Sequence, residues 1–257
     1  MDSQDIEIPI EDGGRTSHLA VRVTRPAAAE ADPLCVLYLH GFRSSQDGDK
    51  ATFFRRHLVD RGLPVATFDF QGHGASGGEL RSLTLSRNLS DLGRVHGLLR
   101  SEGYTRFLLF GSSMGAATAL WYAALHPDDF VAAVHISPAV SMEESLLARV
   151  GRDGEAIWQR DGSLPFPHDK GPVVLDWGLI EDLRSFGSER LAKLYSTPTL
   201  IFQGRRDASV DWRTVLDLAD RVGGGMIVHL MMDGDHRLVD RLDHLWATTE
   251  AYLEGVA

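Results

Sequence analysis

The chain has 257 residues, of which 43% are hydrophobic, and this is enough to bury the core of one large α/β domain. The 36 acidic residues outnumber the 26 Lys and Arg residues, so the net charge at pH 7 is -10. Because nucleic acid phosphates are bound by clustered cations and the chain has no long basic run, this composition argues against nucleic acid as a partner.

The N-terminal residues suggest where the protein works and how its sheet begins. Residues 1–5 are acidic and polar rather than basic and then apolar, which argues against a secretory signal and predicts a cytoplasmic protein. No apolar run approaches the roughly 20 residues that a helix needs to cross a bilayer, so no membrane span is expected. Residues 5–10 alternate between apolar and polar, a turn follows at 11–14, and 19–23 fit a returning strand. We therefore expect an antiparallel pair at one sheet edge.

The next elements alternate between strand and helix. Residues 34–39 are a continuous apolar run that predicts a buried strand, and Cys35 within it is expected to be an inert core residue. It is the only cysteine of the chain, which excludes an intramolecular disulfide. The pattern then predicts a helix from about 51 to 61, a strand over 64–70, and a helix from 85 to near 103.

A strand, a glycine-rich turn and a helix follow one another around Ser113. Residues 106–110 are apolar enough for a central strand of a parallel sheet, and 114–126 continue as a helix. Between them, Gly111 and Gly115 flank Ser113 in a Gly-x-Ser-x-Gly pattern. A serine on such a sharp turn needs neighbours without side chains, because strand and helix pass close together there. The pattern predicts that Ser113 is a nucleophile.

The alternation breaks between residues 141 and 186, a stretch much longer than the usual connection of about 2 to 6 residues. We expect a lid inserted over the carboxyl edge of the sheet, with a helix at 141–150. Its aromatic residues Trp158, Phe166 and Trp177 are candidates for the wall of an acyl pocket. Two alternatives stay open: a surface excursion without contact to the active site, and aromatic residues that only pack the lid onto the body.

Strand patterns at 131–136, 199–203 and 226–231 frame this insertion, and helical patterns follow the last two. Strands that alternate with helices predict a mostly parallel, doubly wound sheet. The sequence thus indicates a single domain over residues 1–257, with the lid at about 141–186.

Serine is a weak nucleophile near neutral pH, so Ser113 needs a base from a loop at the same sheet edge. His236 directly follows the last strand and fits this role. Among its competitors, His40 precedes the nucleophile and is expected to brace a loop. His244 falls within the closing helix, and the spacing of His73 suggests no partner for it.

His236 in turn needs a carboxylate that fixes its tautomer and stabilises the imidazolium formed during turnover. Asp207 directly follows a buried strand, so its side chain is expected at the same edge. Of its rivals, Asp211 is better interpreted as the N-cap of a helix, and Asp235 is adjacent to His236, which gives poor geometry. The candidate catalytic residues are therefore Ser113, Asp207 and His236.

The chain order Ser113, Asp207, His236 is the one associated with the α/β-hydrolase sheet. From about residue 34 to the closing helix, the sequence resembles α/β-hydrolases of the serine-esterase type. The motifs that carry this resemblance are His40-Gly41-Phe42, residues 69–77, residues 111–115, residues 204–207 and Gly234-Asp235-His236. Within the superfamily, residues 40–45 and 235–237 are similar to those of small carboxylesterases and acyl-protein thioesterases.

The resemblance implies an α/β-hydrolase fold and an oxyanion hole, in which backbone N–H groups stabilise negative charge on the substrate oxygen. The two donors would be the N–H groups of Phe42 and Met114. The chain has no His-Gly-Gly-Gly run, so the resemblance does not extend to hormone-sensitive-lipase-like enzymes. No metal and no organic cofactor is expected.

We therefore expect a serine hydrolase that cleaves carboxylic esters or thioesters through an acyl-enzyme, with a small acyl ester or thioester as its partner. The alternatives are a carbon–carbon bond hydrolase or a peptidase on the same residues, and a ligand receptor that retains them but turns over slowly. A haloalkane dehalogenase is disfavoured, since those relatives carry a carboxylate at the position of Ser113. The sequence predicts no particular oligomeric state.

Overall fold

The computed structural model describes residues 2–12, 14–28, 32–166, 168 and 171–256. One sheet within this part of the chain contains eight strands. They are β1 (Asp2–Asp12), β2 (Arg15–Arg25), β3 (Leu34–Leu39), β4 (Val65–Phe68), β5 (Arg106–Ser112), β6 (Phe130–Ile136), β9 (Thr199–Gly204) and β10 (Met226–Met231). Their spatial order is β1-β2-β4-β3-β5-β6-β9-β10. β2 pairs antiparallel with both β1 and β4, and the other neighbours are parallel. The prediction of a mostly parallel sheet with an antiparallel N-terminal edge is confirmed.

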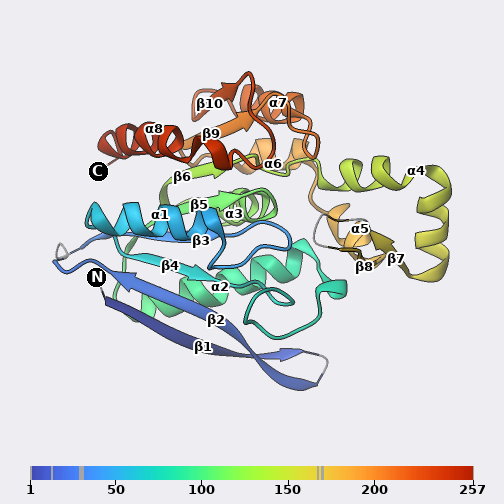
Figure 1. The fold of residues 1–257 in the computed structure, drawn as a ribbon, viewed down its shortest axis with the longest axis horizontal. Helices are drawn as coiled ribbons and strands as arrows, with labels where there is room; N and C mark the ends of the chain where they lie inside the picture. Colours follow the sequence, from blue (N-terminus) through green and yellow to red (C-terminus); the bar gives the residue numbers. More distant parts are fainter. Residues whose placement is uncertain (1, 13, 29–31, 167, 169–170, 257) are drawn as a thin grey trace.

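Helices cover both faces of this sheet (Figure 1). The core cluster on one face includes buried residues of α1 (Asp49–Asp60) and α8 (Leu242–Glu254). The cluster on the other includes residues of α2 (Leu85–Ser101), α3 (Met114–Leu125), α6 (Ser188–Leu194) and α7 (Trp212–Val222). β5 supplies Leu108 and Phe110 to the first cluster and Phe107 and Leu109 to the second, because successive strand residues point to opposite faces. This explains why β5 is apolar without interruption.

The stretch from 141 to 186, which we call the lid, extends beyond the sheet at the right of Figure 1. It contains α4 (Met142–Asp161), a two-stranded sheet of β7 (Ser163–Phe166) and β8 (Val173–Asp176), and α5 (Gly178–Leu183). The helix predicted at 141–150 is only the first part of α4. Gly151 has a φ of 68° and interrupts the helical geometry, after which a second segment continues to Asp161. The sequence pattern stopped at this glycine because glycine commonly ends helices.

Two carboxylates attach the lid to the body. Asp176 accepts hydrogen bonds from the Arg81 guanidinium at 2.7 and 3.0 Å, next to the short 3-10 helix η1 (Leu80–Ser82). Asp182 of α5 accepts from the backbone N–H groups of Leu85 and Ser86, at 2.7 and 3.0 Å. The first N–H groups of a helix lack intrahelical partners, so a lid residue here supplies a cap for α2. A second 3-10 helix, η2 (Val239–Arg241), precedes α8. No helix in the described ranges is long and apolar enough to cross a membrane.

Three buried imidazoles make the fold sensitive to acid. Burial lowers the pKa of His40 to about 4, and that of His73 and of His135 to about 3, against an ordinary value of 6.5. These side chains are neutral in the folded protein, whereas the unfolded chain binds a proton at each as the pH falls below about 6.5. Their contribution to stability is therefore complete above that pH and is lost progressively toward pH 3. Within this window, each of the three imidazoles lowers the free energy of unfolding by up to about 1.4 kcal/mol for every unit by which the pH falls.

His135 offers a direct test of this account. It lies on β6 between Gly111 and Ile201, is 0% exposed, and neither ring nitrogen has a hydrogen-bond partner among the described residues. We expect His135→Leu, which has a similar volume, to raise the free energy of unfolding. The gain at pH 5 should exceed the gain at pH 7.5 by about 2 kcal/mol, because one linked proton is removed.

Urea denaturation at the two pH values measures this difference. His244→Leu, at an exposed position on α8, is the control for a histidine-to-leucine change at the surface. An equal effect of His135→Leu at both pH values would show that His135 does not titrate with unfolding.

Candidate active site

Ser113 occupies a strained turn between β5 and α3. Its φ of 53° and ψ of -115° are rare for a residue with a side chain. The backbone around it holds this conformation: Ser113 N–H donates to the carbonyl of Ile136 at 2.9 Å. The Ser113 carbonyl in turn accepts from the N–H groups of Ala117, at 3.0 Å, and Ala139, at 3.2 Å. The strand, the helix and the segment after β6 thus jointly fix the Ser113 backbone.

Glycine is required around this turn because backbone passes close on every side. A Cβ on Gly115 would lie 2.4 Å from the Leu39 carbonyl oxygen, and one on Gly111 would lie 2.5 Å from Cα of Ala116. Gly41 approaches from a different loop, and a Cβ there would lie 3.3 Å from Cβ of Ser113. The Gly-x-Ser-x-Gly spacing therefore reflects real steric crowding, and the loop that follows β3 lies against the serine.

The structure brings Ser113, His236 and Asp207 together at the carboxyl edge of the sheet. His236 follows β10, and its Nε2 lies 3.0 Å from the Ser113 hydroxyl oxygen. Asp207 follows β9, and its Oδ2 lies 2.7 Å from His236 Nδ1. The Asp207 side chain has no exposed surface, whereas that of His236 is 23% exposed. The three form one continuous hydrogen-bonded chain from buried carboxylate to partly accessible hydroxyl.

Asp207 is held as a carboxylate. Burial raises the pKa of this carboxyl, but hydrogen bonds from His236 and from the N–H groups of Val210 and Ser209 outweigh it, so the net pKa is below the ordinary value. Both N–H groups lie 2.8 Å from Oδ1, and the Gln203 amide donates to Oδ2 at 3.0 Å. Because Oδ1 is occupied by the loop, Oδ2 is directed at His236.

The rival carboxylates have other tasks. Asp211 is the N-cap of α7, and its side chain accepts from the Arg213 N–H at 3.0 Å. Asp235 accepts from the N–H groups of Arg237 and Leu238, at 2.9 and 2.8 Å, and so shapes the loop that carries His236. This loop has a further support that the sequence patterns did not reveal, since Lys50 of α1 donates to the Arg237 carbonyl at 3.2 Å.

The competing histidines contact groups other than the Ser113 hydroxyl. His40 braces a loop, because Phe70 N–H donates to its Nε2 at 3.1 Å while its Nδ1 lies 2.8 Å from the Gly41 carbonyl oxygen. His73 packs beside it, with ring centroids 5.1 Å apart. His244 sits in α8, where its Nε2 lies 3.4 Å from that of His229.

The two backbone groups expected to form the oxyanion hole belong to Met114, next to Ser113 in the chain, and to Phe42. Met114 is the first residue of α3, so its N–H has no acceptor within the helix and lies at the positive end of the helix dipole. Phe42 follows Gly41, the residue that approaches Ser113 across the crowded turn. The Phe42 ring packs against His73 and His168, at centroid distances of 6.0 and 5.6 Å, which fixes its loop.

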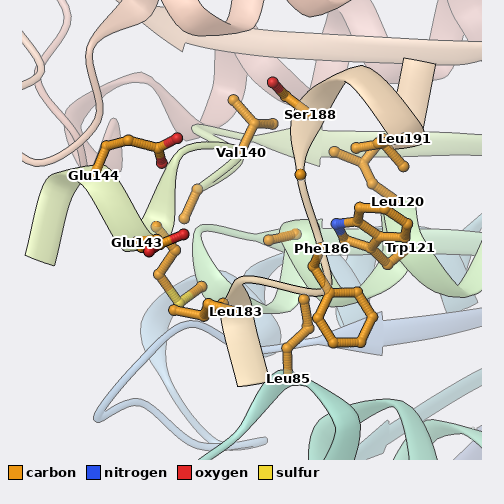
Figure 2. Close-up of a pocket in the computed structure, with 14 residues that line it drawn as sticks. Leu85, Leu120, Trp121, Val140, Glu143, Glu144, Leu183, Phe186, Ser188 and Leu191 are labelled. Carbon is orange, nitrogen blue, oxygen red and sulfur yellow. The ribbon is translucent and has the colours of Figure 1, made fainter. Parts of the chain in front are cut away.

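Figure 2 shows a small apolar pocket beside α3. It lies between α3, the first turn of α4 and the connection from α5 to α6, with a volume of about 30 Å³. Its wall begins at Ala117, one helical turn beyond Ser113, and at Ala139, whose N–H contacts the Ser113 carbonyl. The deeper lining is formed by the apolar side chains of Leu85, Leu120, Trp121, Val140, Met142, Leu183, Phe186 and Leu191. Glu143 and Glu144 also line it and add negative charge.

Trp158, Phe166 and Trp177 are not among the residues that line this pocket. They are 0%, 3% and 7% exposed and pack on one another. The centroid of the Trp158 ring lies 5.2 Å from that of Phe166 and 5.7 Å from that of Trp177. Trp158 Nε1 donates to the Leu175 carbonyl at 2.8 Å. They contact one another inside the lid and belong to the same buried cluster as the body core. Their role in an acyl pocket stays a prediction, and so does the alternative that they only pack the lid onto the body.

Comparisons with known proteins agree with this architecture. The family model described as serine aminopeptidase, S33, matches residues 31–160, which is just over half of the chain. The mitochondrial palmitoyl-protein thioesterase ABHD10 of Mus musculus is 25% identical over 219 residues, covering 83% of this chain and 73% of that protein. Lipase LipV of Mycobacterium tuberculosis is 32% identical over 177 residues, 66% of this chain and 65% of its own length.

Among solved structures, mouse alpha/beta hydrolase domain-containing protein 10 superposes with a TM-score of 0.79 at 21% identity. The superposition covers 98% of this chain and 100% of that one. The likeness supports the fold, and the family match extends from before β3, through the serine turn, into α4. The chain therefore belongs to the α/β-hydrolase superfamily, in the family described as serine aminopeptidase, S33.

Proposed function

We propose that this protein is a serine hydrolase that cleaves carboxylic esters or thioesters through an acyl-enzyme. The observation that carries the proposal is the hydrogen-bonded chain from Ser113 Oγ through His236 to Asp207, at 3.0 and 2.7 Å. A hydroxyl, an imidazole and a buried carboxylate in this order are the groups that nucleophilic acyl transfer requires. Because two relatives are named as a thioesterase and a lipase, thioesters and carboxylic esters are the first substrates to test.

In the proposed first step, Ser113 Oγ attacks the acyl carbon while its proton passes to His236 Nε2. Asp207 accepts from the Nδ1–H and stabilises the imidazolium that forms. Negative charge on the carbonyl oxygen is stabilised by the N–H groups of Met114 and Phe42, each such donor contributing about 3 kcal/mol to barrier lowering. His236 then protonates the departing alkoxide or thiolate. Finally it activates a water that attacks the acyl-enzyme, so that the acid is released and Ser113 regains its proton.

The pocket of Figure 2 is the proposed acyl site. Its apolar lining begins within one helical turn of Ser113, and its volume of about 30 Å³ is room for about two waters. With the lid attached as it is here, we expect acyl groups of about two to four carbons to fit. A fatty acyl chain would require the lid to move away from α3.

An acyl-chain series tests the proposal, with oxygen and sulfur esters of matched acids from two to sixteen carbons offered to the purified protein. We expect turnover of both ester types, with the highest kcat/KM at two to four carbons. Diketone and peptide substrates in the same panel address the carbon–carbon hydrolase and the peptidase. Turnover of diketones or peptides alone would contradict the proposal and favour a carbon–carbon hydrolase or a peptidase. A stoichiometric burst with no turnover of any ester would also contradict it and would favour a receptor.

A further inference from the structure

An open groove with a very different lining lies on the other side of the first α4 segment. It has a volume of about 550 Å³, and three arginines line it: Arg149 from α4, Arg205 from the end of β9 and Arg213 from α7. Its wall includes Asp207, whose carboxylate contacts the His236 imidazole, which in turn contacts the Ser113 hydroxyl. We call it the arginine groove.

Positive charge dominates the arginine groove, although the chain as a whole is acidic. Among the described residues, no carboxylate oxygen lies within 4.0 Å of the guanidinium nitrogens of Arg149 or Arg205. Arg213 pairs with Asp211 at 3.3 Å, and that exposed carboxylate is the negative group facing the arginines. The carboxylate of Asp207 is turned inward to His236 and fully buried. The groove thus carries more positive than negative charge.

Trp212 helps to orient the guanidinium groups. Arg213 lies over its ring at 4.6 Å from the centroid and Arg205 at 5.9 Å. Stacking on an aromatic ring limits the rotation of a guanidinium and leaves its N–H edge free to meet an anion. Such forks match the two oxygens of a carboxylate or a phosphate.

We propose that the arginine groove binds an anionic group, a carboxylate or a phosphate monoester, on the leaving-group half of the substrate. This inference rests on the proposed function. The orientation of the substrate follows from charge, because Glu144 lines the apolar pocket and would repel an anion there, whereas Glu143 is paired with Arg184 at 3.2 Å. The first segment of α4 separates the two sites, with Glu143 facing the acyl pocket and Arg149 the groove. An acyl group on one side and an anion on the other place the scissile carbonyl between them.

The test compares thioesters that differ only in charge. The substrates are S-acetyl esters of mercapto acids with three, six and eight carbons, and the neutral primary amides of the same acids, assayed by thiol release. S-acetyl esters of mercaptoalkyl phosphates form a second arm that distinguishes phosphate from carboxylate. We expect about a tenfold higher kcat/KM for the charged member at one length or more, shrinking in 0.5 M NaCl.

Variants identify the source of any preference. Arg149→Gln and Arg205→Gln should bring the ratio of charged to neutral kcat/KM close to one. Arg221→Gln makes the same charge change on α7, where Arg221 pairs with Asp217 at 3.0 Å outside the groove, and should leave the ratio intact. A ratio near one at all lengths in the unmodified protein, or a preference that survives both groove variants, would overturn the inference.

A binding measurement separates this inference from the proposed function. Calorimetric titration of Ser113→Ala protein with S-acetyl-6-mercaptohexanoate and with its amide needs no turnover. We expect tighter binding of the carboxylate and loss of that advantage when Arg205→Gln is added. Equal affinities would overturn the arginine groove as a site even if esters are cleaved. Charge-dependent binding without cleavage of any ester would support the arginine groove as an anion site and contradict the proposed hydrolase activity.

Discussion

Ser113→Ala is expected to lower kcat/KM for 4-nitrophenyl acetate by about a thousandfold or more, because it removes the hydroxyl that His236 contacts and that would form the acyl-enzyme. The fold should survive. Alanine keeps the Cβ that already occupies the position at φ 53°, and the hydrogen bond lost is the one between the Ser113 hydroxyl and His236. The measurement is chromophore release by purified protein, with thermal denaturation confirming that the variant is folded.

Ser112→Ala is the matched control. Ser112 is the adjacent residue, is 2% exposed and is the last residue of β5. It therefore lies in the same strand and turn as Ser113 but forms no hydrogen bond with His236 within the described residues. We expect it to keep most of the activity. Retention of most activity by Ser113→Ala, or an equal loss in both variants, would show that the nucleophile has been misassigned.

Asp207→Asn should lower kcat by about three to four orders of magnitude while keeping the loop folded. The asparagine oxygen can continue to accept from the N–H groups of Ser209 and Val210, as Oδ1 does now. Its NH₂ group then faces His236 Nδ1, which must become the acceptor, so Nε2 carries the proton and cannot take another from Ser113. The loss therefore comes from the wrong tautomer rather than from unfolding.

Asp211→Asn serves as the control for this prediction, because asparagine is an equally good N-cap and Asp211 contacts neither His236 nor Ser113. We expect near-normal kcat in that variant with 4-nitrophenyl acetate, which carries no anion for the arginine groove. If Asp207→Asn kept near-normal kcat, or if Asp211→Asn lost activity comparably, the buried carboxylate would not be the group that orients the imidazole.

Much of the fold was predictable because its signals are local. β10 has the predicted bounds, 226–231, since a short apolar run follows a glycine cluster. The serine turn was predictable because steric crowding leaves a spacing of glycines that can be recognised in the sequence. The approach of His236 to Asp207 could also be expected, because parallel strands end at one edge of a sheet. Their catalytic roles remain predictions, which the substitutions above test.

The lid and the two proposed binding surfaces could not be predicted in the same way. The direction of the chain after Gly151 depends on a φ of 68° that the sequence pattern does not specify. The pocket of Figure 2 depends on the docking of the lid on α2, through the contact of Asp182 with Leu85, which lies 97 residues away in the chain. The aromatic content of the lid suggested a pocket wall, but Trp158 has a buried hydrogen bond to Leu175 and faces the lid interior.

The central claim is that an acyl group is transferred to Ser113, and trapping that intermediate tests it most directly. Purified protein is mixed with excess S-acetyl thioester, quenched in acid within milliseconds, and mapped by peptide mass spectrometry. The account predicts that one acetyl group accumulates on the peptide containing Ser113 and disappears as the ester is consumed. Turnover with no acetyl group at Ser113 at any time, or with acetylation of a different residue that matches the turnover rate, would contradict it.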